Sequence, residues 1–176
     1  MIKHLWHDVS AGKNAPQKIN TIIEIPQGSH AKYEIDKETS LLKLDRVLHT
    51  PMRYPSNYGF IPQTFCEDGD PLDVLVFSQV TLEPLCLVQA KPIGVVRMLD
   101  EGEMDDKIIA VAKGDRSVDH MEDLSDLPEH LLKEVRVFFE DYKKLEGKKV
   151  EVLSIDDREV ALKTIEESLG MYKSKF

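Results

Sequence analysis

The sequence predicts an α+β fold that is mainly β, a small barrel or sheet with two helices packed on it. Short apolar, β-branched segments separated by turn residues fill the first two thirds of the chain, which is typical of a sandwich or barrel. Beyond residue 126 the apolar residues recur at helical spacing instead. The chain has 176 residues, of which 41% are hydrophobic and 31% charged. That length and composition predict one folded domain, residues 1–176.

Six strands are expected before the first helix and one after it. The first expected strand is rich in isoleucine and stops at Pro26. The long fifth segment is interrupted by Pro92 and Gly94, residues that often mark a bulge or bend in a strand. The expected strands span residues 19–25, 32–35, 41–47, 72–76, 85–99, 107–112 and 149–155.

Two helices are expected in the last third of the chain. In the first, the apolar residues Leu131, Leu132, Val135, Phe138, Phe139 and Tyr142 share one helical face. Asp126, Pro128 and Glu129 supply the chemistry of a helix start, and Gly147 lies beyond the far end. The second helix is expected from about residue 158 to 169, with Asp156 or Asp157 as its cap and Gly170 as its stop.

The composition excludes several classes of protein. The chain has 23 Lys and Arg against 32 Asp and Glu, a formal net charge of −9. This balance argues against nucleic-acid binding, which needs cationic side chains to replace phosphate counterions. No apolar run approaches the ~20 residues of a membrane span, and the first residues lack the apolar stretch of a secretory signal. Cys66 and Cys86 have no metal-type spacing and suit a reducing cytoplasm.

The most informative segment is Asp68-Gly69-Asp70-Pro71-Leu72-Asp73. Two carboxylates 4 Å apart repel by ~4 kcal/mol at an effective dielectric of 20, so a converging cluster requires cations, whereas a solvated turn lets the side chains splay. A second acidic loop carries Asp100, Glu101 and Asp105. Ligands that are all carboxylate suit Mg²⁺, Mn²⁺ or Ca²⁺. The pattern is not an EF-hand, because Asp73 and Gln79 replace its sixth-position glycine and twelfth-position glutamate.

Cationic and phenolic side chains form a second set of candidates for binding a phosphate. Arg forks and Lys ammonium groups bind phosphate oxygens, and tyrosine hydroxyls donate neutral hydrogen bonds. A structural role is open for each of them: Tyr142 fits the apolar helical face, and Arg46 can pair with Asp45 or Asp36. The candidates are Lys32, Arg46, Tyr54, Tyr58, Tyr142 and Lys143.

These motifs together resemble the family I soluble inorganic pyrophosphatases, the Mg²⁺-dependent enzymes of bacteria and archaea. The run from Asp68 to Val74 fits the family's D-x-D-P-x-D-V motif, and the resemblance covers nearly the whole chain. Three further segments occur in the family's order: Lys32-Tyr33-Glu34, Tyr54-Pro55-Ser56-Asn57-Tyr58-Gly59, and Asp100-Glu101 followed by Asp105 and Lys107.

The resemblance implies a five-stranded OB-like closed β-barrel with two flanking α-helices. It also implies that the protein is a cytoplasmic homohexamer. It implies that Mg-pyrophosphate is hydrolysed to two orthophosphates by a metal-bridged hydroxide, with several Mg²⁺ ions per site and Mn²⁺ or Zn²⁺ as substitutes. Asp70 resembles the general base, and Asp73, Arg46 and Tyr58 resemble the other catalytic residues. The implied metal ligands are Asp68, Asp73, Asp100, Asp105 and Glu34, with Glu24 and Glu101 as auxiliary carboxylates. The implied substrate-binding residues are Lys32, Arg46, Tyr54, Tyr58, Lys107, Tyr142 and Lys143.

Three alternatives remain at this point. A non-enzymatic OB-like module that binds divalent cations accounts for both acidic loops but leaves the cationic side chains unexplained. An OB-type nucleic-acid binder is disfavoured by the 7% aromatic content and the acidic balance. A broader phosphoanhydride hydrolase would act on nucleotides as well.

Overall fold

The computed structural model describes residues 4–176, and its fold is mainly β with few helices, as predicted. A seven-stranded sheet has the order β1-β4-β5-β8-β6-β7, with β9 paired to β6. Because β1 also pairs with β6, five of these strands, β1-β4-β5-β8-β6, form a ring of pairings. The strands are β1 (Ile19–Ile25), β4 (Asn57–Phe60), β5 (Asp73–Phe77), β6 (Leu87–Asp100), β7 (Glu103–Met104), β8 (Lys107–Ala112) and β9 (Val150–Asp156).

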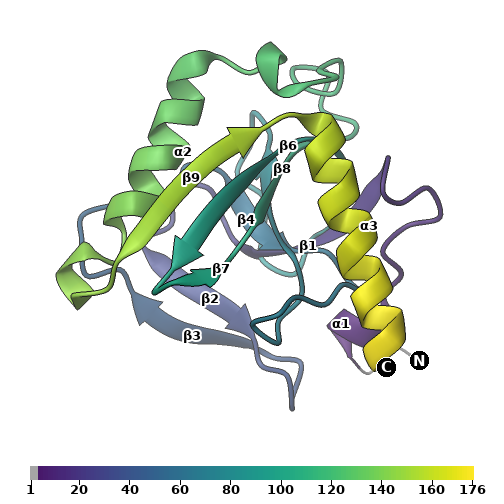
Figure 1. Ribbon diagram of the computed structural model, residues 1–176, viewed down its shortest axis with the longest axis horizontal. Helices are drawn as coiled ribbons and strands as arrows, with labels where there is room; N and C mark the ends of the chain where they lie inside the picture. The colour runs from purple at the N-terminus through teal and green to yellow at the C-terminus, as the bar shows by residue number, and fades with distance from the viewer. Residues whose placement is uncertain (1–3) are drawn as a thin grey trace.

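A separate two-stranded sheet, β2 (Ala31–Ile35) with β3 (Leu42–Val47), lies at one end of the larger sheet (Figure 1). Within the larger sheet the β5–β8 pair is parallel and its register places Asp73 opposite Lys107. The other pairings are antiparallel. The carboxylate at the start of β5 and the lysine at the start of β8 are therefore neighbours.

Two long helices flank the sheet on different sides (Figure 1). Helix α2 (Glu129–Asp141) packs against β9 and buries Val135, Phe138 and Phe139. Helix α3 (Arg158–Lys175) packs against β6 and buries Ala161 and Ile165. Each helix faces its own cluster of buried apolar side chains. No helix in the described residues is both long enough and apolar enough to pass through a membrane.

The expected end of the last helix was wrong. Gly170 does not stop α3, which continues to Lys175. Glycine weakens a helix by about 1 kcal/mol relative to alanine, but here the extra turn packs on the short helix α1 (Leu5–Asp8), which the sequence did not predict. The rings of Tyr172 and Phe176 lie 6.4 and 5.6 Å from the ring of Trp6. These aromatic contacts favour continuation of the helix past the glycine.

The expected strands correspond to elements of the structure, with small shifts at their ends. The fifth begins at Leu87 rather than at 85, because Leu85 has φ +68° and belongs to the preceding turn. Strand β4 was missed, since its four residues are too short for a clear period. The cap of α3 is Asp157, whose side chain accepts a hydrogen bond from the Val160 amide. Two 3₁₀ turns, 124–126 and 144–146, flank α2.

Gly59 lets β4 approach β1 closely enough to pair with it. A Cβ atom at this position would lie 1.9 Å from the carbonyl oxygen of Ile22, a distance that no side chain can adopt. The close approach fixes the position of the neighbouring Tyr58. Gly59 thus permits the pairing of β1 with the strand that carries Tyr58.

Candidate active site

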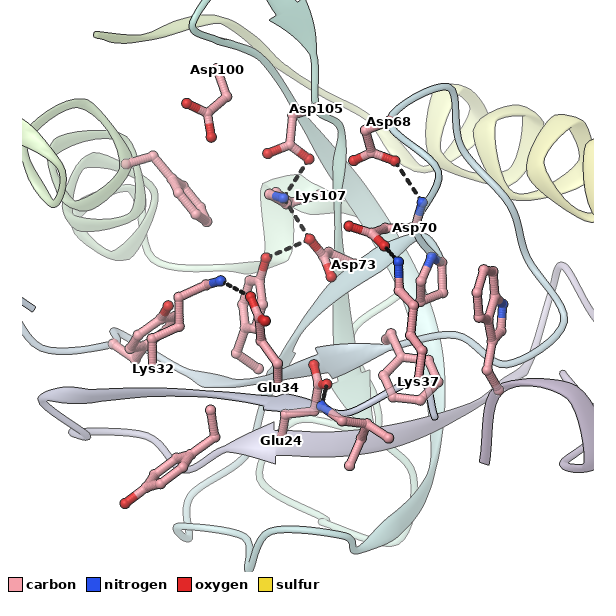
Figure 2. A pocket seen from close by; sticks show the side chains of 18 of the residues that line it. Glu24, Lys32, Glu34, Lys37, Asp68, Asp70, Asp73, Asp100, Asp105 and Lys107 are labelled. Carbon is pink, nitrogen blue, oxygen red and sulfur yellow. Dashed lines mark hydrogen bonds and ion pairs between the residues drawn. The ribbon is translucent and has the colours of Figure 1, made fainter. Parts of the chain in front are cut away.

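One cavity of about 310 Å³ collects most of the residues singled out in the sequence (Figure 2). The side chains come from β1, β2, β4, β5, β6 and β8, from the segments before β4 and β5, from the β7–β8 connection and from the end of α2. The two aspartate-bearing loops therefore meet. The predicted residues that line the cavity are Glu24, Lys32, Glu34, Tyr54, Tyr58, Asp68, Asp70, Asp73, Asp100, Asp105, Lys107, Tyr142 and Lys143.

A tight turn before β5 presents the first two aspartates. Gly69 has φ +87°, a conformation that favours glycine. The amide of Asp70 donates a 3.0 Å hydrogen bond to Asp68 Oδ1, and the amide of Cys66 donates to the carbonyl of Asp70 at 2.9 Å. Asp68 is held by the turn, whereas the Asp70 side chain is half-exposed.

Asp73 lies at the centre of a hydrogen-bonded group. The Tyr58 hydroxyl donates to Asp73 Oδ2 at 2.7 Å, and Lys107 Nζ donates to the same oxygen at 2.6 Å. Lys107 also contacts Asp105 Oδ1 at 2.5 Å, so one ammonium group lies between two carboxylates (Figure 2). Lys107 is 4% exposed. Burial opposes its charge, but Asp73 and Asp105 outweigh that effect and hold the pKa of Lys107 well above its usual value.

The second acidic loop meets the end of α2. The chain turns after β6, and Asp100, the last residue of that strand, forms an ion pair with Lys143. The other carboxylate oxygen of Asp100 is buried without a hydrogen-bond partner in the part of the chain that the structure describes. Tyr142 follows α2; its ring stacks on Phe138 at 5.1 Å, and it also lines the cavity. Tyr142 therefore packs in the apolar core, as one interpretation expected, and also lines the cavity.

Two phenols enter the cavity as neutral hydrogen-bond donors. The rings of Tyr54 and Tyr58 are 5.3 Å apart and both are buried. Burial, with the nearby Asp73 adding to it for Tyr58, raises the pKa of both hydroxyls well above their usual value. They keep their protons at neutral pH.

The β2–β3 sheet supplies the opposite wall. Lys32 forms an ion pair with Glu34 and a longer one with Asp45, at 3.4 Å. Glu24, on β1, accepts a 2.7 Å hydrogen bond from the Ile35 amide and is 8% exposed. Burial raises the pKa of Glu24 to about 8, and the carboxylates of Asp73 and Glu34 add to the rise. Glu24 therefore holds a proton more readily than an ordinary glutamate.

Two predicted residues lie outside the cavity lining. Arg46, on β3, pairs with Glu146 at 2.9 Å and Asp45 at 2.5 Å, which includes one of the two pairings expected for a structural role. Its Nη2 atom is buried without a hydrogen-bond partner in residues 4–176. Glu101 pairs with Lys148 at 3.2 Å and its side chain is half-exposed. The structure does not bring Glu101 into the cavity.

Lys37 is a lining residue that the sequence analysis did not single out. It lies in the turn between β2 and β3 and pairs with Asp70 (Figure 2). Its ammonium nitrogen is 5.6 Å from the centre of the Trp6 ring. Nothing local in the sequence indicates this role, because the contact spans 33 residues and depends on how the hairpin folds over the Asp68–Asp70 turn.

Across residues 4–176, no three carboxylate, imidazole or thiol groups surround a common point as metal ligands would. Lysine ammonium groups neutralise the aspartates instead: Lys37 faces Asp70, Lys107 faces Asp73 and Asp105, and Lys143 faces Asp100. The donor set still has the chemistry of a hard-cation site. It consists of carboxylates, and one of them, Asp100, has a buried oxygen without a hydrogen-bond partner in residues 4–176. Burial raises the pKa of Asp68, and a bound cation would lower that pKa again.

The chain is similar to known proteins over nearly its whole length. A family model described as "Inorganic pyrophosphatase" matches residues 21–173. Soluble inorganic pyrophosphatase 2 of Chlamydomonas reinhardtii is 51% identical over 173 residues, covering 98% of this chain and 90% of that protein. Soluble inorganic pyrophosphatase 1 of Arabidopsis thaliana is 49% identical over 169 residues, covering 96% and 80%.

Solved structures show the same likeness. The inorganic pyrophosphatase of Thermus thermophilus superposes with a TM-score of 0.91 at 42% identity, covering 94% of this chain and 97% of that one. A truncated vacuolar soluble pyrophosphatase of Trypanosoma cruzi, solved in complex with PPi, has a TM-score of 0.84 at 25% identity, with coverage of 97% and 78%. The family depends on metal ions for activity. The chain belongs to the inorganic pyrophosphatase family and is an enzyme that hydrolyses inorganic pyrophosphate.

Proposed function

We propose that this chain hydrolyses Mg²⁺-complexed pyrophosphate to two orthophosphate ions in the cavity between its two aspartate-bearing loops, with Mn²⁺ or Zn²⁺ as substitutes. One observation carries the proposal: aspartates from residues 68–73 and 100–105 meet at one cavity that also contains lysines and buried tyrosine hydroxyls. Carboxylates attract cations, and the cationic and phenolic groups bind phosphate oxygens. The site thus offers carboxylates to the metal ions of the substrate and cationic and phenolic groups to its phosphates.

The proposed metal ligands are all carboxylates. In this structure each of them either pairs with a lysine or is partly buried. They are Asp68, Asp73, Asp100, Asp105 and Glu34, with Glu24 and Glu101 as auxiliary carboxylates. Bound cations supply Lewis acidity: they neutralise charge on the phosphates and acidify water. Of the two auxiliary residues, Glu24 lines the cavity and Glu101 does not. That difference makes Glu24 the stronger candidate.

The proposed substrate-binding groups act by orienting and neutralising the phosphates. They are Lys32, Arg46, Tyr54, Tyr58, Lys107, Tyr142 and Lys143. The Nη2 atom of Arg46, which is buried without a hydrogen-bond partner in residues 4–176, is the donor proposed for a phosphate oxygen. Tyr58 donates to Asp73 here and keeps its proton. In phosphoryl transfer, such positioning and electrostatic stabilisation supply nearly all of the acceleration.

Asp70 is the proposed general base. Its carboxylate is half-exposed and faces the cavity, so water reaches it, and among residues 4–176 its side chain pairs with the ammonium group of Lys37. A general base must accept a proton from the attacking water, which requires an accessible carboxylate within hydrogen-bond reach. Asp73, Arg46 and Tyr58 complete the proposed catalytic set.

The finer features of the architecture are also proposals. We infer that the ring β1-β4-β5-β8-β6 is the five-stranded OB-like barrel and that residues 1–176 form one domain; the closed ring of pairings supports this. The family resemblance supports a homohexamer, and the exposed apolar side chains of Val137 and Leu145 beside α2 are available for an interface. The two free cysteines support a cytoplasmic location.

A phosphate-release assay tests the proposal. With Mg²⁺, pyrophosphate should release orthophosphate, and ATP should be hydrolysed far more slowly. Asp73→Asn should reduce the rate by about 100-fold or more, because it alters a carboxylate that meets both Tyr58 and Lys107. Asp141→Asn, a change in an exposed pair with Lys144, is the matched control. Comparable rates on ATP would favour a broader phosphoanhydride hydrolase, and no phosphate release would favour the cation-binding module.

A further inference from the structure

A second cavity, of about 300 Å³, lies away from the active site and is lined by cationic side chains. We call it the lysine pocket and define it by Lys18, Lys91, Lys113, Arg158, Asp119 and Glu122. Strand β8 begins at Lys107 in the active site and ends at Ala112, directly before Lys113. Six residues of extended strand span about 20 Å, so the two sites stand at opposite ends of the same strand.

Strand register brings the three lysines together. Ile19 on β1 pairs with Ala90 on β6, and Ala90 pairs with Ala112 on β8. Lys18 precedes Ile19, Lys91 follows Ala90 and Lys113 follows Ala112, so each lysine is one residue away from this row of paired positions. The start of α3 adds Arg158, whose amide is held by the Asp123 side chain at 3.1 Å. The pocket is thus formed by regular structure.

The charges within the lysine pocket do not balance. Four cationic side chains face two carboxylates, although the whole chain carries a net charge of −9. Glu122 is already engaged by Lys91 and by Arg158, the latter at 3.1 Å. Lys91 also donates to the Asp119 carbonyl at 2.9 Å. This bonding fixes Lys91 and Arg158 but leaves Lys18 and Lys113 without a carboxylate ion pair among residues 4–176.

The two unpaired lysines repel each other. Lys113 is the largest cause of a lowered pKa at Lys18, Lys91 adds to the effect, and the attraction of Glu122 is smaller. In addition, the Nε atom of Arg158 is buried without a hydrogen-bond partner in the described residues. The like charges of Lys18 and Lys113 and the unpartnered donor of Arg158 would all be satisfied by a ligand with negatively charged oxygen atoms.

We propose that the lysine pocket binds a small phosphate-bearing dianion, either orthophosphate or the phosphate group of a monoester, at a site separate from the active site. A phosphate group carries about −1.5 to −2 charge at pH 7, which matches the excess of positive charge in the pocket. Lys18 and Lys113 are the primary binding groups, Arg158 adds its Nε donor, and Glu122 holds Lys91 and Arg158 in position. The inference is independent of the metal and base assignments above.

Titration calorimetry on the metal-free, full-length enzyme tests the proposal with inorganic phosphate as the probe. The variant Lys18→Gln/Lys113→Gln should lose one binding event or weaken it by at least about tenfold, because two charge-assisted hydrogen bonds are removed. Lys163→Gln/Lys173→Gln removes the same charge from α3, outside the pocket, and should bind phosphate as the parent does. Hydrolysis of pyrophosphate should be unchanged in both double variants.

Selenate is a tetrahedral dianion with an anomalous signal, so crystals soaked in selenate reveal where the anion binds. A peak between Lys18 and Lys113 that is absent from the double variant supports the site. Ribose 5-phosphate, titrated in parallel, distinguishes the sources: tighter binding than orthophosphate identifies a monoester, and equal or weaker binding identifies free phosphate. Identical isotherms for the parent and the Lys18→Gln/Lys113→Gln variant, or selenate bound only in the active site, would overturn the proposal.

Discussion

The ammonium nitrogen of Lys107 lies 2.6 Å from Oδ2 of Asp73, and the register of β5 and β8 places these two residues opposite each other. The same ammonium group contacts Asp105. A buried lysine therefore neutralises two of the aspartates proposed as metal ligands. Under the proposed assignment, cations held by these carboxylates would leave the lysine free to bind a phosphate oxygen. The proposal therefore links the stability of the enzyme to its handling of substrate through Lys107.

Lys107→Met should destabilise the metal-free enzyme by about 3–5 kcal/mol, the cost of leaving one partner of a buried ion pair uncompensated. Mg²⁺ should restore part of this loss, since a cation takes the place of the ammonium charge. Urea unfolding with EDTA and with excess Mg²⁺ measures both effects. Lys133→Met, at an exposed position on α2, is the control. A variant that Mg²⁺ stabilises no more than it stabilises the parent would contradict this account.

Asp70→Asn should separate activity from stability. Its pair with Lys37 is half-exposed on both sides, and such pairs contribute only about 0–1 kcal/mol. Loss of a general base lowers turnover by about 10²–10⁴-fold. We expect a near-parental unfolding curve, a near-parental Mg²⁺ titration and a strongly reduced kcat. Lys37→Gln breaks the same pair but keeps the carboxylate, so it should retain most activity; equal losses in both variants would argue that the pair matters rather than the base.

Glu24→Gln should make the metal-free enzyme more stable than its parent at alkaline pH. The pKa of Glu24 is raised from 4.5 to about 8 in the folded state, so between these values the folded protein holds a proton that the unfolded chain releases. The protonated Glu24 carboxyl adds its full contribution to the free energy of unfolding below about pH 4.5. This contribution falls as the pH rises toward 8, by roughly 5 kcal/mol at most. Glutamine keeps the hydrogen bond from the Ile35 amide without a charge.

Urea unfolding of both proteins in EDTA, from pH 5 to pH 8.5, measures this difference. The parent should lose stability relative to the variant across that range. Parallel curves would show that Glu24 does not change its protonation in the folded protein.

Arg46→Ala should raise KM for pyrophosphate by about tenfold or more, because the lost guanidinium donor forms charge-assisted hydrogen bonds. The other donors of Arg46 pair with Asp45 and Glu146 outside the cavity lining, so Mg²⁺ binding to the free enzyme should change little. Steady-state kinetics and calorimetry measure the two quantities. Lost metal binding with unchanged KM would assign Arg46 to the metal site instead.

Local patterns in the sequence predicted the class of fold and most of the elements, and they indicated the chemistry proposed for the site. Isoleucine-rich runs and helical spacing predicted β1, α2 and the start of α3, because hydrophobic period and cap residues are local properties. The Asp68–Asp73 run indicated oxygen ligands for the same reason, since side-chain type and spacing are written in the chain.

Which groups face each other depends on contacts between distant segments, which no local pattern contains. The pairing of Lys37 with Asp70 joins residues 33 positions apart, and no local pattern encodes it. The continuation of α3 past Gly170 depends on aromatic contacts with Trp6 at the other end of the chain. The gathering of Lys18, Lys91 and Lys113 follows from the register of three strands. Charges and rings act through distance in space, and strand pairing and packing set that distance.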